Sequence, residues 1–465
     1  MAGIAGIAQS GRCAVVERML DRIQHRGPAG REIIETAGAT LGVAWPAHQA
    51  QARTLLLDRQ IARDGGGKWH LAQAQAANGH LILIRDNLGL APLYYGWTPE
   101  GHLCFASEVK SLLEVTRNVH EFPSGSSGDG TRLGRHFELR EAESIPESPE
   151  VIAAELRRRL ENSVQKRLSG PVAGCWLSGG LDSSTIVALA RPHVEQLHTF
   201  SVGLQGAPDL EFARETAEFL NTTHHELVVT LDELLSVLPK VIYHLESFDA
   251  LLVRSSLTNF LVGELSSRYV PAVFSGEAGD ELLAGYEYLK SLLFCQLAGE
   301  LIDITNRLHN TAFQRVDRSA SAHGMVALVP FADGQVVEYA VRIPVEHKLR
   351  GGVEKWILRE ALDGLLPERV LRRTKSKFWQ GTGLGDLLAQ YADEHVTDEE
   401  FRRERSLANG WTINSKEELL YYRVFREHFG ELQNLSWMGR TKGAPEAGLE
   451  LAPVAEEVGS CKREI

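Results

Sequence analysis

Sulfur is scarce in this chain of 465 residues, which contains five cysteines and four methionines. The cysteines are scattered along the chain, at Cys13, Cys104, Cys175, Cys295 and Cys461, and none belongs to a C-x-x-C pair. This pattern is typical of reduced thiols and excludes a disulfide framework or a cysteine-based zinc site.

The sequence also lacks an excess of positive charge and any long hydrophobic run. Its formal net charge is -12 at pH 7, which argues against a protein that coats nucleic acid or an anionic membrane. It has no run of about 18 apolar residues for a membrane span, and its first residues do not resemble a signal peptide. We therefore expect a cytoplasmic protein with small-molecule substrates and with neither a nucleic-acid nor a membrane partner.

The length of the chain predicts two domains, because a single hydrophobic core stops growing at this size. Residues 1–120 alternate short apolar runs with turn residues, as in HLILIRDNLGLAPLYYG, and predict a β-rich domain. Residues 121–154 are rich in glycine, serine and charge and are expected to form a linker. We place the second domain at residues 155–440 and expect the remaining 441–465 to be disordered.

The second domain alternates apolar strands with amphipathic helices. AGCWL, LHTFSVGL, HELVVT and YVPAVFSGE read as strands, and SSTIVALAR and DLEFARETAEFLNT read as helices. This alternation predicts a doubly wound parallel sheet, with ligands at the carboxyl ends of its strands.

A phosphate-binding loop is predicted where the first of these strands ends, in CWLSGGLDSSTIVAL. Adjacent glycines let backbone N–H groups close around an anion, and the helix that follows adds its positive N-terminal end. The loop is not a Walker A motif, because no lysine follows the glycines. Its candidate ATP-binding residues are Ser178, Gly179, Gly180, Asp182, Ser183 and Ser184.

The loop resembles the pyrophosphate-binding loop of the N-type ATP pyrophosphatases, which split ATP between its α and β phosphates. Within that superfamily the chain resembles the asparagine synthetase B family, through ESFDALLVRSS, FSGEAGDELLAGYEYL, VPFADGQVVEYAVRIP and KWILREALDGLLPERVLRRTKSKF, in that order. HRGP and RDNLGLAPLYYG extend the resemblance into the first domain. The resemblance implies an α/β protein, with an N-terminal Ntn-hydrolase-like (αββα) domain before a PP-loop synthetase domain that uses ATP and Mg²⁺.

FSGEAGDELLAGY also follows a strand, and brings Glu277, Asp280 and Glu281 to the edge of the sheet that carries the phosphate loop. Because Mg²⁺ takes one or two carboxylates together with phosphate oxygens, Asp182 and Asp280 are the candidate metal ligands. By resemblance, Glu277 is the general base that takes a proton from the incoming ammonium.

A cation is needed where negative charge builds up on the α phosphate, and RRTKSKFWQG supplies one. By resemblance this residue is Lys375, with Lys377 as the alternative. Leu177, Val202 and Gly276 align with family positions that hold the nucleoside, and Ser275 is assigned to the ATP site beside them.

The first domain departs from the family, whose glutamine-hydrolysing members carry a cysteine at position two and an Asn-Gly-Glu loop that holds glutamine. This chain has Ala2, and the stretch between GVAWPAHQ and NGHLILIRD is short and alanine-rich. Arg26, Gly27 and Pro28 are kept. Since the nucleophile and the glutamine loop are both missing, we expect a degenerate domain without glutaminase activity.

A second departure lies in the synthetase domain. Where the family reads Glu-x-Arg-Val-Pro-Phe-Leu-Asp, this chain has Val326 and Leu328 in place of the two charges. If those charges help to orient the acyl substrate or line an ammonia route, the acid is not aspartate.

The sequence thus predicts an ATP-dependent, AMP-forming ligase that adenylates a small carboxylic acid, aspartate or an analogue, and joins ammonia or a small amine to it. One alternative is a β-lactam synthetase-like enzyme that closes an amide within one substrate, although that type has a tyrosine where Glu277 stands. Another is a non-catalytic scaffold subunit, which the retained Asp182, Glu277, Asp280 and Lys375 disfavour. The sequence leaves open a homodimer and a separate glutaminase that supplies ammonia.

Overall fold

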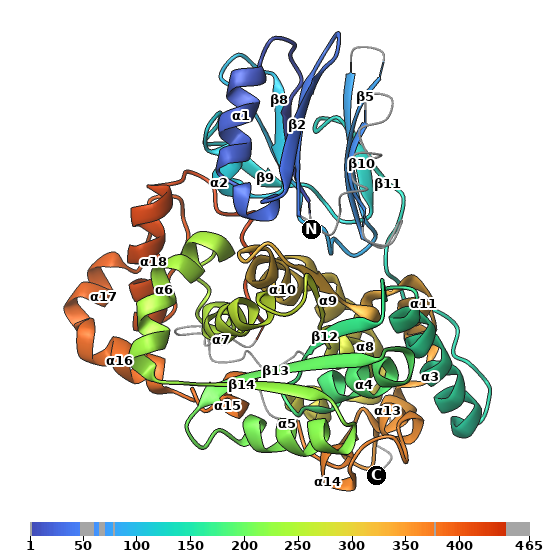
Figure 1. The fold of residues 1–465 in the computed structure, drawn as a ribbon. Helices are drawn as coiled ribbons and strands as arrows, with labels where there is room; N and C mark the ends of the chain where they lie inside the picture. The colour runs from blue at the N-terminus through green and yellow to red at the C-terminus, as the bar shows by residue number, and fades with distance from the viewer. Residues whose placement is uncertain (1, 47–59, 65–69, 78–79, 376–377, 443–465) are drawn as a thin grey trace.

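The structure is a computed structural model that describes residues 2–46, 60–64, 70–77, 80–375 and 378–442. Figure 1 shows a β-rich N-terminal part packed on a larger α/β part. Within the described residues, none of the helices has the length and apolar character needed to cross a membrane. Cys13, Cys104, Cys175 and Cys295 are free thiols, and Cys461 lies outside the described residues.

The N-terminal part is a sandwich of two antiparallel sheets. The first sheet has the order β2 (Gly30–Glu35), β3 (Thr40–Trp45), β1 (Gly3–Ile7), β8 (Leu103–Ala106), β7 (Tyr94–Trp97) and β9 (Val119–Glu121). The second has the order β11 (Leu133–Arg135), β10 (Ser126–Gly128), β6 (His80–Arg85), β5 (Leu71–Ala77) and β4 (Gln60–Asp64).

Side chains of β1 alternate between two apolar clusters, as expected of a strand with both faces covered. Ile4 packs into the cluster between the two sheets, whereas Ala5 and Ile7 pack with α1 (Cys13–Asp21) on the outer face. Gly42 of β3 permits this close approach, because a Cβ there would lie 2.6 Å from Val16 of α1.

The helices of the sandwich lie on one sheet. α1 packs on β1, β2 and β3, and α2 (Val109–Leu112) packs on β7 and β8. Apart from the short 3₁₀ turn η1 (Gln24–Arg26), the described residues up to Arg135 form no other helix. The predicted Ntn-hydrolase-like sandwich is therefore present in a reduced form, with its second sheet uncovered by any described helix.

The segment expected to be a linker, 121–154, contributes to both parts of the molecule. Its strands β10 and β11 join the second sheet, and α3 (Pro149–Gln165) begins before residue 155. Glycine and serine gave these strands the appearance of a linker, because β10 is the three-residue segment SSG. The other predicted domain limits stay predictions, and 443–465 of the predicted tail lie outside the described residues.

The α/β part contains a five-stranded parallel sheet, as predicted. Its order is β14 (Thr223–Val229), β13 (Gln196–Leu204), β12 (Val172–Trp176), β15 (Ala272–Phe274) and β16 (Val326–Leu328). Helices α4 (Leu181–Ala190) and α5 (Pro208–Phe219) lie on one face, and α7 (Ala250–Ser267) and α10 (Ala312–Ser321) on the other (Figure 1).

Most of the remaining chain is helical and surrounds this sheet. The further helices are α6 (Leu231–Leu245), α8 (Gly279–Leu283), α9 (Phe294–Asn306), α11 (Gly334–Arg342), α12 (Val345–Lys348), α13 (Trp356–Ala361), α14 (Glu368–Leu371), α15 (Phe378–Gly381), α16 (Leu387–His395), α17 (Asp398–Glu404) and α18 (Lys416–Phe429). A two-stranded ladder, β17 (Leu349–Arg350) with β18 (Val353–Glu354), precedes α13.

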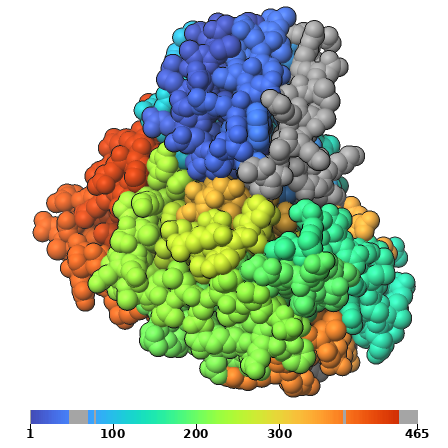
Figure 2. Space-filling view, viewed as in Figure 1, coloured from blue at the N-terminus to red at the C-terminus, as the bar shows by residue number. Residues whose placement is uncertain are grey.

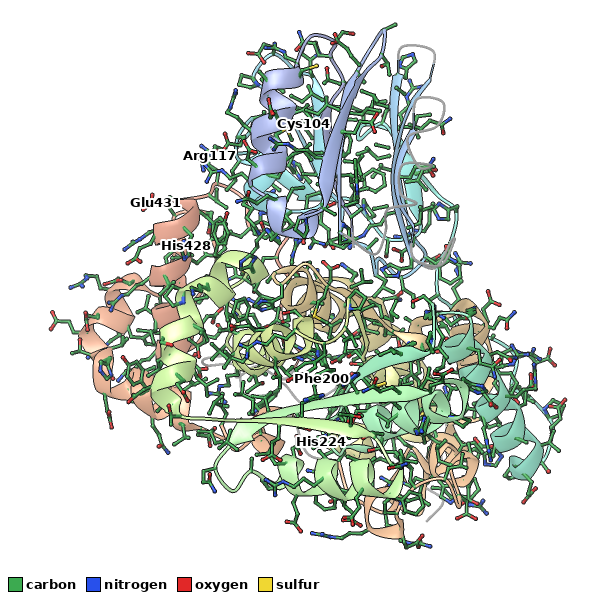
Figure 3. All side chains as sticks on the ribbon, viewed as in Figure 1. Cys104, Arg117, Phe200, His224, His428 and Glu431 are labelled. Carbon is green, nitrogen blue, oxygen red and sulfur yellow. The ribbon has the colours of Figure 1, made fainter. Side chains whose placement is uncertain are left out.

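The two parts of the molecule share a continuous contact surface. In Figure 2 the blue N-terminal part sits directly on the green, yellow and orange surface of later residues. At one edge of this contact Arg117 lies beside the end of α18, near His428 and Glu431 (Figure 3), and donates a 3.2 Å hydrogen bond to the carbonyl of Phe429.

Candidate active site

Two loops meet at the carboxyl edge of the parallel sheet, where the strand order reverses between β12 and β15. One loop runs from β12 into α4, and the other from β15 into α8. A Cβ on Gly276 would lie 2.7 Å from the backbone nitrogen of Ser183, so only glycine lets the loops pack this closely. Such a reversal point is where open α/β sheets bind their ligands.

The β12 loop has the geometry of an anion-binding turn. Gly179 has φ +65°, and a Cβ there would clash with Phe212 and the backbone of α5. The Ser183 hydroxyl accepts a 3.2 Å hydrogen bond from the backbone N–H of Ser178, which closes the loop on itself. The first turn of α4 carries no side-chain cap, so its N–H groups remain available to a phosphate.

A cavity of about 1050 Å³ opens at this edge and brings together most of the predicted site residues. Phe200 of β13, labelled in Figure 3, forms part of its wall. The predicted residues that line it are Leu177, Ser178, Asp182, Ser183, Val202, Ser275, Gly276, Glu277, Asp280 and Lys375.

Three predicted residues of the phosphate loop do not line this cavity. Gly179 packs against α5, and Gly180 lines a smaller recess beside the cavity. Ser184 is buried, and its hydroxyl lies 3.4 Å from that of Thr216. Lys377 lies outside the described residues.

The acidic pair Asp182 and Asp280 is bound by two lysines. Lys355 Nζ lies 2.5 Å from Asp182 Oδ2 and 2.5 Å from Asp280 Oδ1. Lys375 Nζ lies 2.6 Å from Asp280 Oδ2. Sequence reasoning missed Lys355, because an isolated lysine at the start of an amphipathic helix looks like surface.

The pKa values of these groups follow from burial and from the two lysines. Burial alone would raise the pKa of Asp280, but Lys355 and Lys375 lower it to about 2. Burial raises the pKa of Asp182, which Lys355 offsets only in part. Burial opposes the charge of Lys375, yet Asp280 and Asp182 hold its pKa above the ordinary value. Lys375 is therefore a permanent cation beside the phosphate loop.

The donor set of the pair suits a magnesium ion. Asp182 Oδ1 is buried and accepts no hydrogen bond from the described residues, so a coordination position is available. The described residues contain no group of three or more His, Cys, Asp or Glu side chains placed to hold a metal. Two carboxylates completed by phosphate oxygens are instead the usual surroundings of Mg²⁺ in nucleotide sites.

Glu277 faces the cavity next to this pair. Its Oε1 accepts a 2.7 Å hydrogen bond from Arg315 of α10, and its side chain is 22% exposed. Glu281 lies deeper and accepts a hydrogen bond from the Tyr286 hydroxyl. Burial and the nearby Asp280 raise the pKa of Glu281 to about 7.

Apolar and polar side chains share the cavity wall that α7 and α9 form. α7 presents Leu251, Leu252 and Val262 together with Ser255 and Asn259, and α9 presents Ile304. The cation of α7, Arg254, does not line the cavity and instead binds Glu417, with Nε 2.7 Å from Oε1. Val326 and Leu328, where the family carries two charges, belong to β16 and do not line the cavity either.

The first domain has an apolar side chain at the nucleophile position. Ala2 is 2% exposed and packs in the apolar cluster between the two sheets, with Ile4 and Leu41. Arg26 and Pro28, which the sequence shares with the family, face the synthetase part instead: Arg26 binds Asp317, and Pro28 lies against Gly324. The alanine-rich stretch that replaces the glutamine loop lies partly outside the described residues.

Comparison with known proteins agrees with this arrangement. The family model "Asparagine synthase" matches residues 155–303 and 297–454, which include both nucleotide loops and Lys375. The chain belongs to the asparagine synthase family. The model "Glutamine amidotransferase domain" matches residues 54–114. The prediction of an asparagine synthetase-like carbon–nitrogen ligase is confirmed at the level of the family.

Curated relatives include asparagine synthetase B [glutamine-hydrolyzing] of Escherichia coli, 36% identical over 75% of this chain and 67% of the relative. Asparagine synthetase [glutamine-hydrolyzing] 2 of Arabidopsis thaliana is also 36% identical, over 75% of this chain and 64% of the relative. The chain thus spans about two thirds of the length of these relatives. Among solved structures, NMN synthetase from Francisella tularensis has a TM-score of 0.31 at 14% identity, covering 62% of this chain and 98% of that chain.

Proposed function

We propose that this protein is an ATP-dependent, AMP-forming amide ligase. It adenylates a carboxylate and then transfers ammonia or a small amine to the acyl group, without hydrolysing glutamine. The observation that carries this proposal is the convergence of the phosphate loop, the acidic pair and Lys375 on one cavity at the switch point of the sheet.

ATP binds with its phosphates at the N–H groups of the β12 loop and the first turn of α4. Leu177, Val202, Ser275 and Gly276 surround the nucleoside end of the cavity. Asp182 and Asp280 would hold Mg²⁺, which neutralises charge on the phosphates when it is bound. Lys355 holds the two carboxylates together and adds positive charge beside them.

In the first step, a carboxylate oxygen of the acid attacks the α phosphorus, and the bond to the α–β bridging oxygen breaks. Pyrophosphate leaves and an acyl-adenylate remains. Negative charge builds up on the α phosphate in this transition state, and Lys375 stabilises it there without giving up a proton.

In the second step, Glu277 removes a proton from ammonium, and the free amine attacks the acyl carbon. The attached nitrogen gives up a second proton to solvent, AMP leaves with its phosphate oxygen, and an amide remains. Arg315 holds Glu277 on the cavity wall by the 2.7 Å hydrogen bond. Glu277 is the base rather than Glu281, because its side chain is 22% exposed, whereas Glu281 is buried and accepts a hydrogen bond from the Tyr286 hydroxyl.

The cavity lining offers contacts to both apolar and charged parts of an acid. Leu251, Leu252 and Val262 are apolar, whereas Arg307 and Lys442 bring positive charge to the same cavity. The lining is therefore compatible with aspartate and with a related acid that carries an apolar portion. A cavity of about 1050 Å³ also has room for an acid that carries its own amine, which keeps intramolecular amide formation as the second candidate.

One experiment tests the proposed reaction. The protein is mixed with Mg²⁺, ATP, ammonium and a panel of acids that contains aspartate, larger apolar acids and acids with an internal amine. We expect AMP and pyrophosphate, resolved by chromatography, with at least one acid of the panel. ADP and phosphate as products would contradict the assignment, and no turnover with any acid would favour a scaffold.

A further inference from the structure

The first domain contacts the segment that leads into α10. This segment is the 3₁₀ turn η6 (Leu308–Asn310). Glu121 at the end of β9 accepts hydrogen bonds from His309 Nδ1 at 2.7 Å and from Asn310 Nδ2 at 3.3 Å. Gly89 touches the same turn, since a Cβ there would lie 2.8 Å from His309 Cβ. η6 therefore cannot move without breaking contacts to the first domain.

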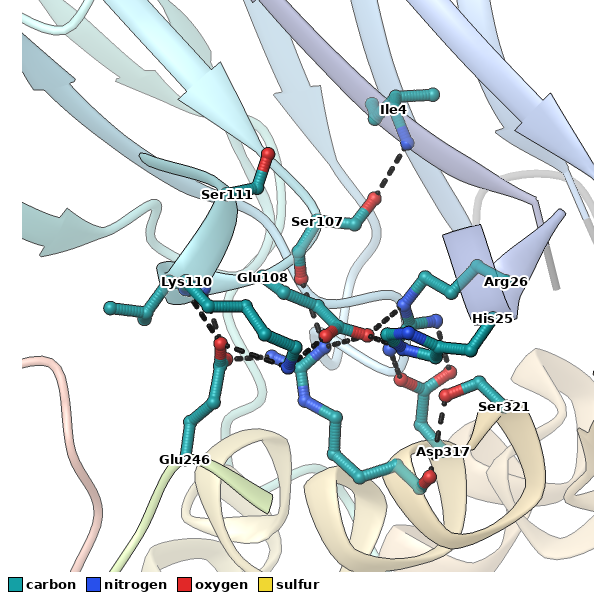
Figure 4. Close-up of polar contacts among 12 residues, drawn as sticks. Ile4, His25, Arg26, Ser107, Glu108, Lys110, Ser111, Glu246, Asp317 and Ser321 are labelled. Atoms are coloured by element: carbon teal, nitrogen blue, oxygen red, sulfur yellow. Dashed lines mark hydrogen bonds and ion pairs between the residues drawn. The ribbon is translucent and has the colours of Figure 1, made fainter. Parts of the chain in front are cut away.

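The first domain also forms ion pairs with the second half of α10 (Figure 4). Arg26 Nη2 lies 2.6 Å from Asp317 Oδ2, and its Nε donates to Glu108. Glu108 in turn lies 2.9 Å from Arg318 Nη1. Asp317 and Arg318 belong to α10, whereas Arg26 and Glu108 belong to the first domain.

These side chains belong to a buried and balanced ionic network. Its side chains are at most 4% exposed. Three cations face three anions: Arg26, Lys110 and Arg318 against Glu108, Glu246 and Asp317. A buried charge that loses its partner is strongly destabilising, so a shift of α10 against the first domain is opposed from several directions at once.

Arg315 lies on the first half of α10, between the Glu121 contact with η6 and the ionic network. It is the residue that donates to Glu277 in the cavity. The ionic network and the Glu121 contact therefore determine where Arg315 stands, and through it where the Glu277 carboxylate points. A base that is turned away from its proton loses most of its effect, because catalysis requires hydrogen-bond reach.

We propose that the first domain, which has Ala2 at the nucleophile position, serves as a brace that fixes α10 through Arg26, Glu108 and Glu121 and so orients Glu277 for amide formation. The proposal rests on the proposed function for its chemical consequence. Its structural part, the immobilisation of α10, is independent of any activity. Asp317 and Glu121 are positioning residues in this scheme.

The test uses two variants. Asp317→Asn removes one charge of the network, and Glu121→Gln weakens the hydrogen bonds to His309 and Asn310. We expect both to slow amide formation roughly 10-fold at pH 7, because a displaced base is poorly aligned. Pyrophosphate exchange into ATP should stay within about twofold of wild type, since adenylation uses Lys375 rather than Glu277. Raising the pH should restore part of the lost rate by supplying free amine. The charged or titratable groups near Glu277 are Arg315, Glu281, Tyr286, Asp280 and Lys375.

Asp333→Asn is the matched control. Asp333 binds Arg167 at 2.9 Å and is as buried as Asp317, but it caps the start of α11, and its carboxylate pairs with Lys166 and Arg167 of the synthetase part rather than with the first domain. Thermal unfolding measures the loss of stability common to such variants. The brace is overturned if Asp333→Asn also slows amide formation without slowing pyrophosphate exchange. It is overturned as well if Asp317→Asn slows amide formation and pyrophosphate exchange equally.

Amide hydrogen exchange supplies a readout that does not need turnover. Residues 312–321 should exchange faster in Asp317→Asn and Glu121→Gln than in wild type. In Asp333→Asn their exchange rates should equal those of wild type. Unchanged exchange in the first two variants would overturn the brace, even in an active enzyme. Faster exchange in a protein that forms no AMP would support the brace and contradict the proposed function.

Discussion

Two lysines bind the acidic pair of the cavity, and one of them, Lys355, has an unusual backbone conformation. Lys355 has φ +52° and is one of five non-glycine residues with positive φ in the described chain. Ala278 and Ala284, at the two ends of α8, are two others. Such conformations cost about 1–3 kcal/mol each and persist only where surrounding packing holds them. Their grouping around Asp280 shows that packing holds this corner in one arrangement.

Lys375→Ala should slow adenylation by roughly 10²-fold or more, because it removes a fixed cation from the transition state. Ground-state binding of ATP should change little, since the loop N–H groups still bind the phosphates. Pyrophosphate exchange at saturating ATP measures the first effect, and equilibrium nucleotide binding measures the second. An equal loss of binding and rate would mean that Lys375 only supports the fold.

Glu277→Gln should act on the second step alone. Exchange of pyrophosphate should persist, while amide formation at pH 7 slows because ammonium must lose its proton without help. Raising the pH towards the pKa of ammonium should recover part of the rate, because more free ammonia is then present. The same change should not rescue Lys375→Ala. A variant that lost exchange as well would remove the division of roles between the two residues.

At the scale of elements, the β12 loop is held from both sides. Phe212 and Ala213 of α5 leave room only for glycine at position 179, and the β15 loop leaves room only for glycine at 276. The phosphate-binding shape of the loop is therefore set by its neighbours as well as by its own sequence.

Gly179→Ala should disturb this element selectively. The added methyl group clashes with α5 and the residue resists φ +65°, so the loop must shift away from α5. Overpacking of this kind costs about 1–3 kcal/mol, which corresponds to roughly tenfold weaker ATP binding or more. Gly206→Ala is the control, since Gly206 has φ +77° but no atom within 4 Å of a Cβ. Equal effects of the two variants on ATP affinity would show that strain, not the contact with α5, is responsible.

At the scale of the whole molecule, the domain that contains Ala2 shares a buried interface with the other. The inner apolar cluster contains Ala2, Ile4 and Phe105 from one sheet and Ala72 and Leu83 from the other. The charges that the domain shares with α10 lie where it faces the synthetase part (Figure 4).

Ala2→Cys should not create glutaminase activity. A thiol at a position that is 2% exposed is not accessible to a substrate, and nucleophilicity without a binding pocket lacks the contribution of positioning. Glutamate release from glutamine, measured on the purified variant, should stay at background, while ammonia-dependent amide formation is unchanged. Glutamate release above background would show that the first domain still binds glutamine.

The sequence by itself determined the chemistry-bearing loops and the class of the second domain. SGGLDSS and SGEAGDE each follow an apolar strand, and parallel strands end at one edge, so their meeting in one cavity was predictable. Local patterns suffice here, because both the strand and the loop that follows it are contiguous in the chain. Gly179, Gly180 and Ser184 were predicted with the rest of the loop but do not line the large cavity.

Only the tertiary structure decided the contacts between segments that are distant in sequence. Lys355 reaches Asp182 across 173 residues, and Arg26 reaches Asp317 across 291. A single basic residue carries no periodic signal, and the partner of a buried charge depends on which elements pack together. For the same reason β10 and β11 resembled a linker: short, glycine- and serine-rich strands are stabilised by the ladder they join rather than by their own composition.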